Sequence, residues 1–255
     1  MDYIPAFMVD ADRETVTEAC WAVAFYLEKS SEKTQRIKNI VYMNITDKLL
    51  ELFGEDDPIT IRPVLRILCH LSYGTNDIIQ VFYTNRLVES LYNALYIGYS
   101  KLRGEAAWTI SNLILTNEKI ALDFFIPDLL NKIIDMAIND SRLFCRIEAL
   151  SILHSFVCTM CARIIDELIF RYRLLDLIME MLKDPETQIV EKSLDLLGKI
   201  LQYGGTLDQT HNQAALYIQD HFDMDIFFEL QKKESHAIYT KTKNLLMDYF
   251  NDIIE

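Results

Sequence analysis

The chain has 255 residues, 51% of them hydrophobic, and a formal net charge of −13 from 25 Lys and Arg and 38 Asp and Glu. This composition can bury a sizeable core and excludes a wholly disordered chain, while only 7 Gly and 5 Pro are too few for a β-sandwich or barrel. The negative charge argues against binding DNA or RNA phosphates. It favours either a basic partner or simple solubility.

The five Cys have irregular spacing, which indicates a reduced compartment rather than a disulfide framework. Cys158 and Cys161 form a lone CxxC pair with no second pair or His at metal spacing, so two helical thiols are a better interpretation than zinc or redox chemistry. No apolar run resembles a signal peptide or is long enough to span a membrane. We expect a soluble intracellular protein without a cofactor.

Similar helical segments recur along the chain. In chain order they are EACWAVAFYLEKS with Trp21, RPVLRILCHLSYG with Arg66, GEAAWTISNL with Trp108, IEALSILHSFVC with Leu150 and EKSLDLLGKILQYGG with Asp195. The reference residues are 45, 42, 42 and 45 positions apart. A period near 42 with helices throughout is typical of armadillo or HEAT repeats. The sequence therefore predicts an all-α fold, an armadillo-repeat right-handed superhelical solenoid of about five to six repeats.

We expect one solenoid over residues 1–255, with an incomplete opening repeat at 1–15, full repeats over 16–205 and a terminal repeat at 206–255. Pro127 should divide a short helix from a longer one. The opening segment MDYIPAFMV resembles the end of a helix whose packing partners are absent, so we expect an apolar face there. A partner or a second copy would cover it, or the chain is an incomplete version of a longer protein.

Glu105, Trp108 and Asn112 share one face of their predicted helix, because residues three and four apart are neighbours. The decapeptide alone favours core packing for the tryptophan. The buried stripe of this helix is already supplied by four apolar residues, Ala106, Ala107, Ile110 and Leu113. An exposed Asn matches the N–H and C=O of an extended peptide, an indole face accepts a Lys or Arg stem and charge, and an exposed Glu attracts the cationic tip. Together they predict a slot for a basic residue.

Several of these segments resemble importin-α, the family of adaptors that recognise nuclear localisation signals. EAAWTISNL and EACWAVAFYL resemble its groove helix, with Phe25 where the family often has an aromatic residue instead of Asn, and RPVLRILCHLSYG resembles the repeat that has Arg in the Trp position, here Arg66. The terminal stretch resembles the family's last repeat through eight residues in matching order, Leu230, Gln231, Glu234, Ile238, Tyr239, Lys241, Tyr249 and Phe250.

The resemblance implies binding of basic nuclear localisation peptides in an acidic groove, in the cytoplasm and nucleus. It implies a minor peptide site at Trp108, Asn112 and Glu105 bounded by Arg66, and contact of the terminal repeat with a nuclear export receptor. The repeats that form the family's major site and its basic importin-β-binding arm have no counterpart in this sequence, which puts the importin-β contact in doubt.

The minor site also departs from the family pattern at neighbouring repeats. His70 and His154 stand at Asn positions and Leu150 stands at a Trp position. A Leu can cover a lysine stem but has no π face, and each His is either a peptide contact or a plain groove-lining or partly buried residue. Arg66 would repel a basic side chain, and we expect it to pair with a neighbouring acid.

Two functions remain open at the level of sequence. The Trp108 triad and the charge favour an adaptor for basic peptides, whereas the departures at His70, Leu150 and His154 favour an armadillo scaffold that has lost peptide reading and binds a folded partner. An enzyme is not expected, because no glycine-rich phosphate loop, G-x-S-x-G or H-E-x-x-H motif is present.

Overall fold

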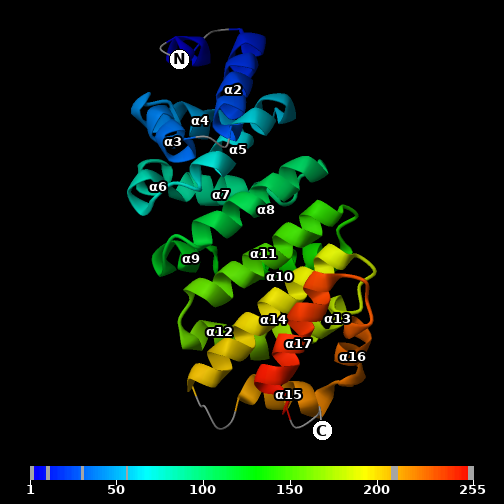
Figure 1. The fold of residues 1–255 in the computed structure, drawn as a ribbon. Coiled ribbons are helices and arrows are strands. Elements are labelled where there is room, and N and C mark those ends of the chain that lie inside the picture. The colour runs from blue at the N-terminus through cyan, green and yellow to red at the C-terminus, as the bar shows by residue number, and fades with distance from the viewer. Residues whose placement is uncertain (1–2, 10–11, 30–31, 56, 208–211, 252–255) are drawn as a thin grey trace. The chain divides into compact units, whose positions relative to one another are not determined.

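The computed structural model describes residues 3–9, 12–29, 32–55, 57–207 and 212–251, without the side chains of 206 and 207 (Figure 1). Within these residues the regular structure is helical, in seventeen helices. They are α1 Ile4–Met8, α2 Arg13–Glu28, α3 Lys33–Tyr42, α4 Thr46–Phe53, α5 Pro58–Leu71, α6 Asn76–Phe82, α7 Asn85–Ala94, α8 Ser100–Ile114, α9 Glu118–Phe124, α10 Pro127–Asn139, α11 Leu143–Thr159, α12 Ala162–Phe170, α13 Leu174–Met181, α14 Thr187–Leu207, α15 Gln213–His221, α16 Asp225–Gln231 and α17 His236–Tyr249.

The chain divides into two compact units, Met1–Leu130 and Asn131–Glu255. The first unit contains α1 to α9 and the start of α10, and the second contains the remaining helices. The expected subdivision at 1–15, 16–205 and 206–255 stays a prediction.

Several helices begin at a side chain that caps the backbone. Asp57 accepts hydrogen bonds from the amides of Ile59 and Thr60 at the start of α5, and Asn117 accepts one from Ile120 in α9. Such caps satisfy amide groups that lack a partner inside the helix. Pro127 is the first residue of α10 and follows the short helix α9, so the predicted division at this proline is confirmed.

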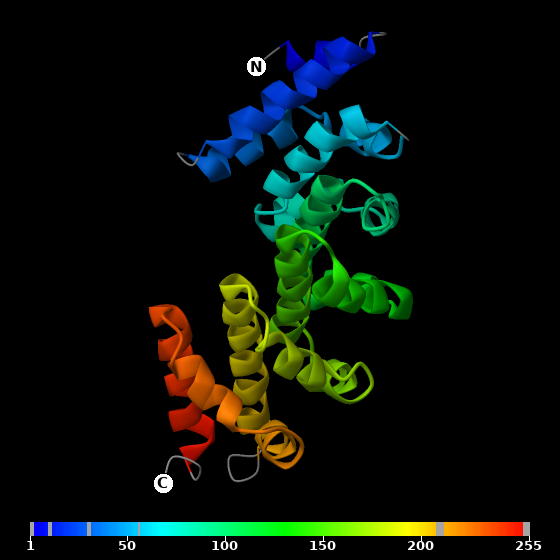
Figure 2. The same ribbon diagram turned by 90° about the vertical axis from the view of Figure 1, so that its right-hand side faces the viewer.

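In the first unit α5 packs against both α2 and α8. Figure 2 shows these helices in the blue to green part of the ribbon. The contact faces are apolar, with Leu65 and Leu68 fully buried, and a buried hydrogen bond of 2.9 Å joins the hydroxyls of Thr17 and Thr60 across α2 and α5. The repeated helices around Trp21, Arg66 and Trp108 therefore pack side by side in this unit.

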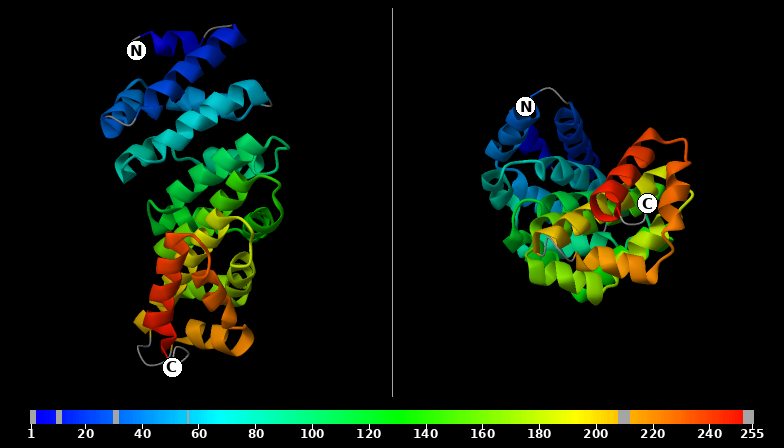
Figure 3. Two further views of the ribbon diagram at one scale, coloured as in Figure 1. Left: turned by 45° about the vertical axis from the view of Figure 1, so that its right-hand side comes forward. Right: turned by 60° about the horizontal axis from the view of Figure 1, so that its bottom comes forward.

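The second unit repeats the arrangement, because α14 packs against both α11 and α17. Figure 3 shows α17 in red beside α14 in yellow. Arg146 of α11 fixes the surrounding helices by donating to the carbonyl of Ala137 at 2.9 Å and by pairing with Asp184. The ion pair is mostly buried, with side-chain exposures of 15% and 9%, so loss of either partner would leave a costly unpaired charge.

Three apolar side chains at the first helix are exposed: Tyr3 at 77%, Phe7 at 47% and Val9 at 70%. The apolar face expected for the opening segment is thus seen in its described part, residues 3–9. Residues 1 and 2 lie outside the described residues. The expectation that a partner or a second copy covers this face stays a prediction. No helix of the described chain is both long and apolar enough to cross a membrane.

Candidate functional site

Helix α8 presents Trp108 and Asn112 on one side, which we call the Trp108 face. Both side chains are partly exposed. The expected stripe of Ala106, Ala107, Ile110 and Leu113 is fully buried. The face therefore lies beside the core stripe of the helix, as the residue spacing predicted.

Glu105 differs from its expected role as an exposed acid. The residue is only 8% exposed, and its Oε1 accepts a hydrogen bond of 3.1 Å from Nη1 of Arg66 in α5. Burial raises the pKa of Glu105, and Arg66 is the largest influence that opposes this rise. The expected exposure of Glu105 is wrong, because the residue is buried and paired with Arg66; its contact with a peptide stays a prediction.

Arg66 is held by two acids, which confirms its expected pairing. Its Nη2 lies 2.9 Å from Oε1 of Glu28 in α2, in addition to the contact with Glu105. Burial opposes the charge on the guanidinium, but the hydrogen bond to Glu28 and the charges of both acids raise the pKa of Arg66 overall. Arg66 stays charged and links α2, α5 and α8 across the Trp108 face.

The same guanidinium lies over the indole, with its carbon 5.7 Å from the centre of the Trp108 ring. This distance is within the range of a cation–π contact. Tyr73 meets the indole edge-on at 5.9 Å between ring centres, and Nζ of Lys33 lies 3.4 Å from the centre of the Tyr73 ring. A cation from this chain thus occupies the position that the sequence assigned to a peptide side chain.

Asn112 keeps part of its hydrogen-bonding capacity. Its amide nitrogen donates to the hydroxyl of Ser72 at 3.0 Å. The carboxamide has two N–H donors and one carbonyl acceptor. One donor and the acceptor have no hydrogen-bond partner within the described part of the chain. These are the groups that one peptide unit of an extended strand can pair with.

His70 lies inside the unit, at 6% exposure, and meets Trp108 edge-on at 6.4 Å between ring centres. Burial lowers its pKa to about 4, with Arg66 and Lys33 adding to the effect, so the ring is neutral at pH 7. Neither ring nitrogen has a hydrogen-bond partner in the described structure. A direct peptide contact would need the ring to move outward.

Phe25 of α2 is 57% exposed and stacks on Trp21, with ring centres 5.5 Å apart. The guanidinium of Arg62 lies 5.3 Å from the centre of the Trp21 ring. Each tryptophan of this unit therefore has its own arginine neighbour from α5, Arg62 for Trp21 and Arg66 for Trp108. A peptide contact at Phe25 stays a prediction.

The structure places Leu150 inside the second unit. It has no exposed surface, whereas Ser151 is 9% exposed and Glu148 and His154 are partly exposed. One residue turns an α-helix by about 100°, so a change of one residue in the spacing between repeats changes which side chain corresponds to Trp108. A spacing of 43 matches Glu148 to Glu105 and Ser151 to Trp108. The prediction that Leu150 covers a lysine stem is wrong because the side chain is fully buried.

The remaining predicted positions of the second unit have partners from their own chain. His154 lies 3.7 Å, through Nδ1, from the sulfur of Cys158, and burial lowers its pKa. Asp195 of α14 forms an ion pair of 2.7 Å with Lys241 of α17. A peptide contact at His154 stays a prediction.

Sequence reasoning missed the side chains that reach the Trp108 face from α2 and from the end of α5: Glu28, Ser72 and Tyr73. None of them stands at either of the two recurring positions, four residues apart, that Trp108 and Asn112 occupy in their repeat. Tyr73 lies just after α5, so predicting its contact with Trp108 would have required the end of this helix to be located to within one residue. Among the described residues, no group of three His, Cys, Asp or Glu side chains could hold a metal ion.

Comparison with known proteins places the chain near armadillo-repeat proteins. No family model matches. The chain is 28% identical over 98 residues to importin subunit alpha-3 of Arabidopsis thaliana, which is 38% of this chain and 18% of that protein. It is 27% identical over 108 residues to importin subunit alpha-1a of Oryza sativa subsp. japonica, or 42% of this chain and 20% of that protein. The chain thus matches about a fifth of the length of these curated relatives and is a distant, partial homologue of importin-α.

Solved structures show the fold over nearly the whole chain. A designed armadillo repeat protein in complex with the peptide (KR)4 matches with a TM-score of 0.81 at 14% identity, covering 97% of this chain and 98% of that one. A second designed armadillo repeat protein matches with a TM-score of 0.79 at 13% identity, covering 97% and 99%. The predicted all-α armadillo-repeat fold is confirmed.

Proposed function

We propose that the chain is an importin-α-like adaptor that binds an extended basic peptide at the Trp108 face, for import of proteins carrying nuclear localisation signals. The observation that carries the proposal is the pair of partly exposed side chains on α8, Trp108 and Asn112, one turn apart. Support comes from the partial similarity to importin-α and from the designed armadillo protein whose complex contains a Lys-Arg peptide. Action in both cytoplasm and nucleus belongs to this proposal, as does contact of the terminal repeat with an export receptor.

The residues of the face have separate tasks in this function. Asn112 pairs its free N–H and carbonyl with one peptide unit, which fixes the strand without reading its side chains. The indole of Trp108 covers the methylene stem of a lysine or arginine, a contact worth about 0.5–2 kcal/mol. Glu28, with 37% of its side chain exposed, supplies the acid that Glu105 does not.

Arg66 sets the limit on affinity. An incoming cation must share the indole and Glu28 with the guanidinium, which is already 5.7 Å from the ring centre. We therefore expect weak binding, in the micromolar range or weaker. The same observation favours a second candidate function, an armadillo scaffold that no longer reads peptides and binds a folded partner.

A fluorescence titration separates the two functions. Trp21→Phe leaves Trp108 as the single tryptophan, since the chain has two. In this background a basic nuclear-localisation peptide should shift the Trp108 emission. A dye-labelled form of the peptide, followed by fluorescence anisotropy, should bind more tightly than a charge-matched scramble. Asn112→Ala should remove the difference between the two peptides. Asn131→Ala, at an exposed position of α10, should retain it.

The outcome for Arg66→Gln completes the test. If Arg66 competes with peptide, the variant should bind the basic peptide about fivefold or more tightly than the parent, by release of one cation–π contact. Equal binding of peptide and scramble by parent and Arg66→Gln proteins would exclude peptide reading and leave the scaffold function.

A further inference from the structure

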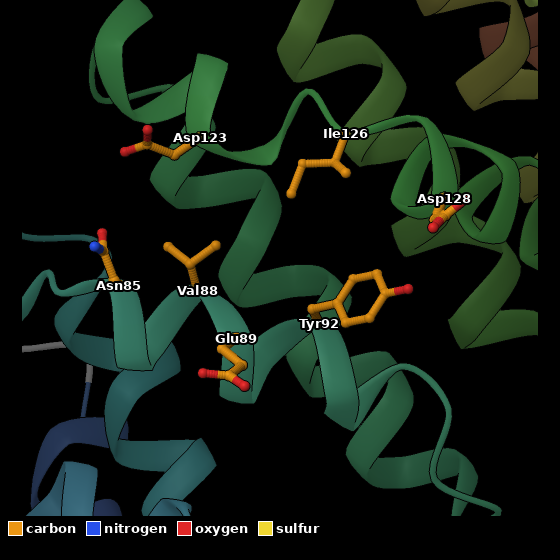
Figure 4. A pocket seen from close by; sticks show the side chains of 7 residues that line it. All are labelled: Asn85, Val88, Glu89, Tyr92, Asp123, Ile126 and Asp128. Carbon is orange, nitrogen blue, oxygen red and sulfur yellow. The ribbon is translucent and has the colours of Figure 1, made fainter.

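A separate pocket of about 430 Å³ lies in the first unit, a size within the usual range of ligand sites of about 300–1,000 Å³. No residue of α2, α5 or α8 lines it. The lining residues come from α7, α9, the link after α9 and the first turn of α10: Asn85, Val88, Glu89, Tyr92, Asp123, Ile126 and Asp128 (Figure 4).

The middle of the pocket is apolar. Figure 4 shows Val88 and Ile126 extending into the space between α7 and the α9–α10 link, with Tyr92 beside them. Ile126 is 40% exposed although it is fully apolar. Tyr92 is held by Tyr96, with ring centres 5.2 Å apart and hydroxyls 3.2 Å apart. This surface suits an aliphatic stem and a planar group that stacks on an aromatic ring.

Carboxylates surround the apolar middle. Glu89 lies on α7, and Asp123 and Asp128 lie on either side of Ile126 (Figure 4). None of the three forms an ion pair with another described residue. Asp123 accepts a hydrogen bond of 2.8 Å from the hydroxyl of Tyr83, which orients its carboxylate. The pocket therefore concentrates negative charge that no ion pair within the described residues neutralises.

We infer that this pocket receives an arginine side chain from a partner protein. A guanidinium presents five N–H donors in a planar fork and can reach carboxylates that lie apart. The three acids do not form a group that could hold a metal ion. The methylene stem would cover Val88 and Ile126 while the guanidinium stacks on Tyr92. The net charge of −13 draws a basic partner towards the surface.

The test is a titration of the full chain with acetyl-Gly-Arg-Gly-amide, following the backbone amide signals of Val88, Tyr92 and Ile126 by NMR. The matched probe is acetyl-Gly-citrulline-Gly-amide, which keeps the shape and loses the charge. The arginine peptide should produce saturable shifts at these three amides, and the citrulline peptide should bind at least about fivefold more weakly.

The double variant Asp123→Asn/Asp128→Asn should weaken arginine binding by about fivefold or more. Asn at position 123 can still accept the Tyr83 hydrogen bond. The control Asp47→Asn/Asp220→Asn changes the net charge by the same amount at two exposed positions of other helices and should bind as the parent does. Asn112→Ala should also bind as the parent does, so failure here is distinguishable from failure of the proposed function.

Three results would overturn the assignment. The citrulline peptide would bind as well as the arginine peptide, or the two double variants would lose affinity equally. Alternatively, spermidine would saturate the same signals at a lower concentration than the arginine peptide, which would identify a site for a free polyamine.

Discussion

At a spacing of 43 residues, Glu105 of α8 and Glu148 of α11 correspond to each other, one in each unit, yet only one of them has an arginine partner. Glu105 pairs with Arg66 at 3.1 Å. Glu148 forms no ion pair with a described residue, and burial raises its pKa to about 7 although Lys192 partly opposes the rise. Burial raises the pKa of both acids, and the direct ion pair with Arg66 is what Glu105 has and Glu148 lacks.

The side chains that follow these two acids on the same helix faces also differ. Trp108 and Asn112 follow Glu105, whereas Ser151 and Ser155 follow Glu148 at the same spacings. The serines donate to the carbonyls of Ile147 and Ser151 within their own helix. They present no indole and no carboxamide. Only the α8 face combines an aromatic plane with free peptide-like hydrogen-bonding groups.

This comparison depends on matching Glu148 to Glu105, and Leu150→Ala tests that match with the largest expected effect. Leu150 is fully buried, so truncation should lower the free energy of unfolding by about 3 kcal/mol, within the usual range for buried Leu. Urea unfolding followed by circular dichroism measures it. Ser151→Ala should change stability by less than about 0.5 kcal/mol. A loss below about 1 kcal/mol for Leu150→Ala would contradict its burial and favour the spacing of 42 residues, which places Leu150 on the surface.

The fold was predictable because many weak signals along the chain agree. Apolar residues at helical spacing, a repeat near 42 and Pro127 at a helix start all pointed to armadillo repeats. The site was less predictable, since a repeat length that varies between 42 and 45 leaves each alignment uncertain by one residue. An error of one residue moves a side chain by about 100° around the helix, so a spacing of 42 residues predicts a surface position for the buried Leu150.

Side-chain contacts between different helices were a second limit on predicting the site from the sequence. The pattern placed Glu105 correctly beside Trp108 but could not reveal that Arg66, 39 residues earlier, reaches Glu105 and the indole together. Whether an acid is exposed or paired depends on the reach of side chains from the neighbouring helix. The pocket at Asp123 and Asp128 had no sequence signal, because its residues come from two helices and a link with no shared motif.

The second prediction concerns Glu148, the acid without an arginine partner. The pKa of Glu148 rises from 4.5 to about 7 in the folded protein. Below pH 4.5 both folded and unfolded states hold the proton, and as the pH rises to about 7 the unfolded state loses it first, so stability falls across this window. Glu148→Gln should stabilise the protein by roughly 2 to 3 kcal/mol at pH 8 and by much less at pH 4.5.

Chemical unfolding of parent and variant at the two pH values measures the difference. Glu105→Gln is the matched control, and its gain at pH 8 should be clearly smaller because Arg66 offsets the cost of burial. If both substitutions gave equal gains, the distinction between a paired and an unpaired acid would not hold. A gain for Glu148→Gln that does not vary with pH would point to packing rather than ionisation.

Arg66→Gln should make Glu105 resemble Glu148, with the smallest effect of the three. The variant loses contacts with Glu105 and with Glu28, the latter too exposed to contribute much. We expect a loss of about 1–2 kcal/mol at pH 8, between the values for exposed and buried pairs. Without the arginine the pKa of Glu105 rises further, so this loss should shrink as the pH falls towards 4.5, because fewer Glu105 carboxyl groups are charged there.

Arg62→Gln is the control, because Arg62 lies over Trp21 much as Arg66 lies over Trp108 but has no ion pair with a described residue. It should cost about 0.5–1 kcal/mol, the value of a cation–π contact, and its cost should vary less with pH than that of Arg66→Gln because its charge opposes the raised pKa of Glu105 less than that of Arg66 does. Adding Glu105→Gln to Arg66→Gln should recover stability at pH 8. Equal, pH-independent losses for both arginine variants would mean that Arg66 acts through the indole alone and that Glu105 does not depend on it.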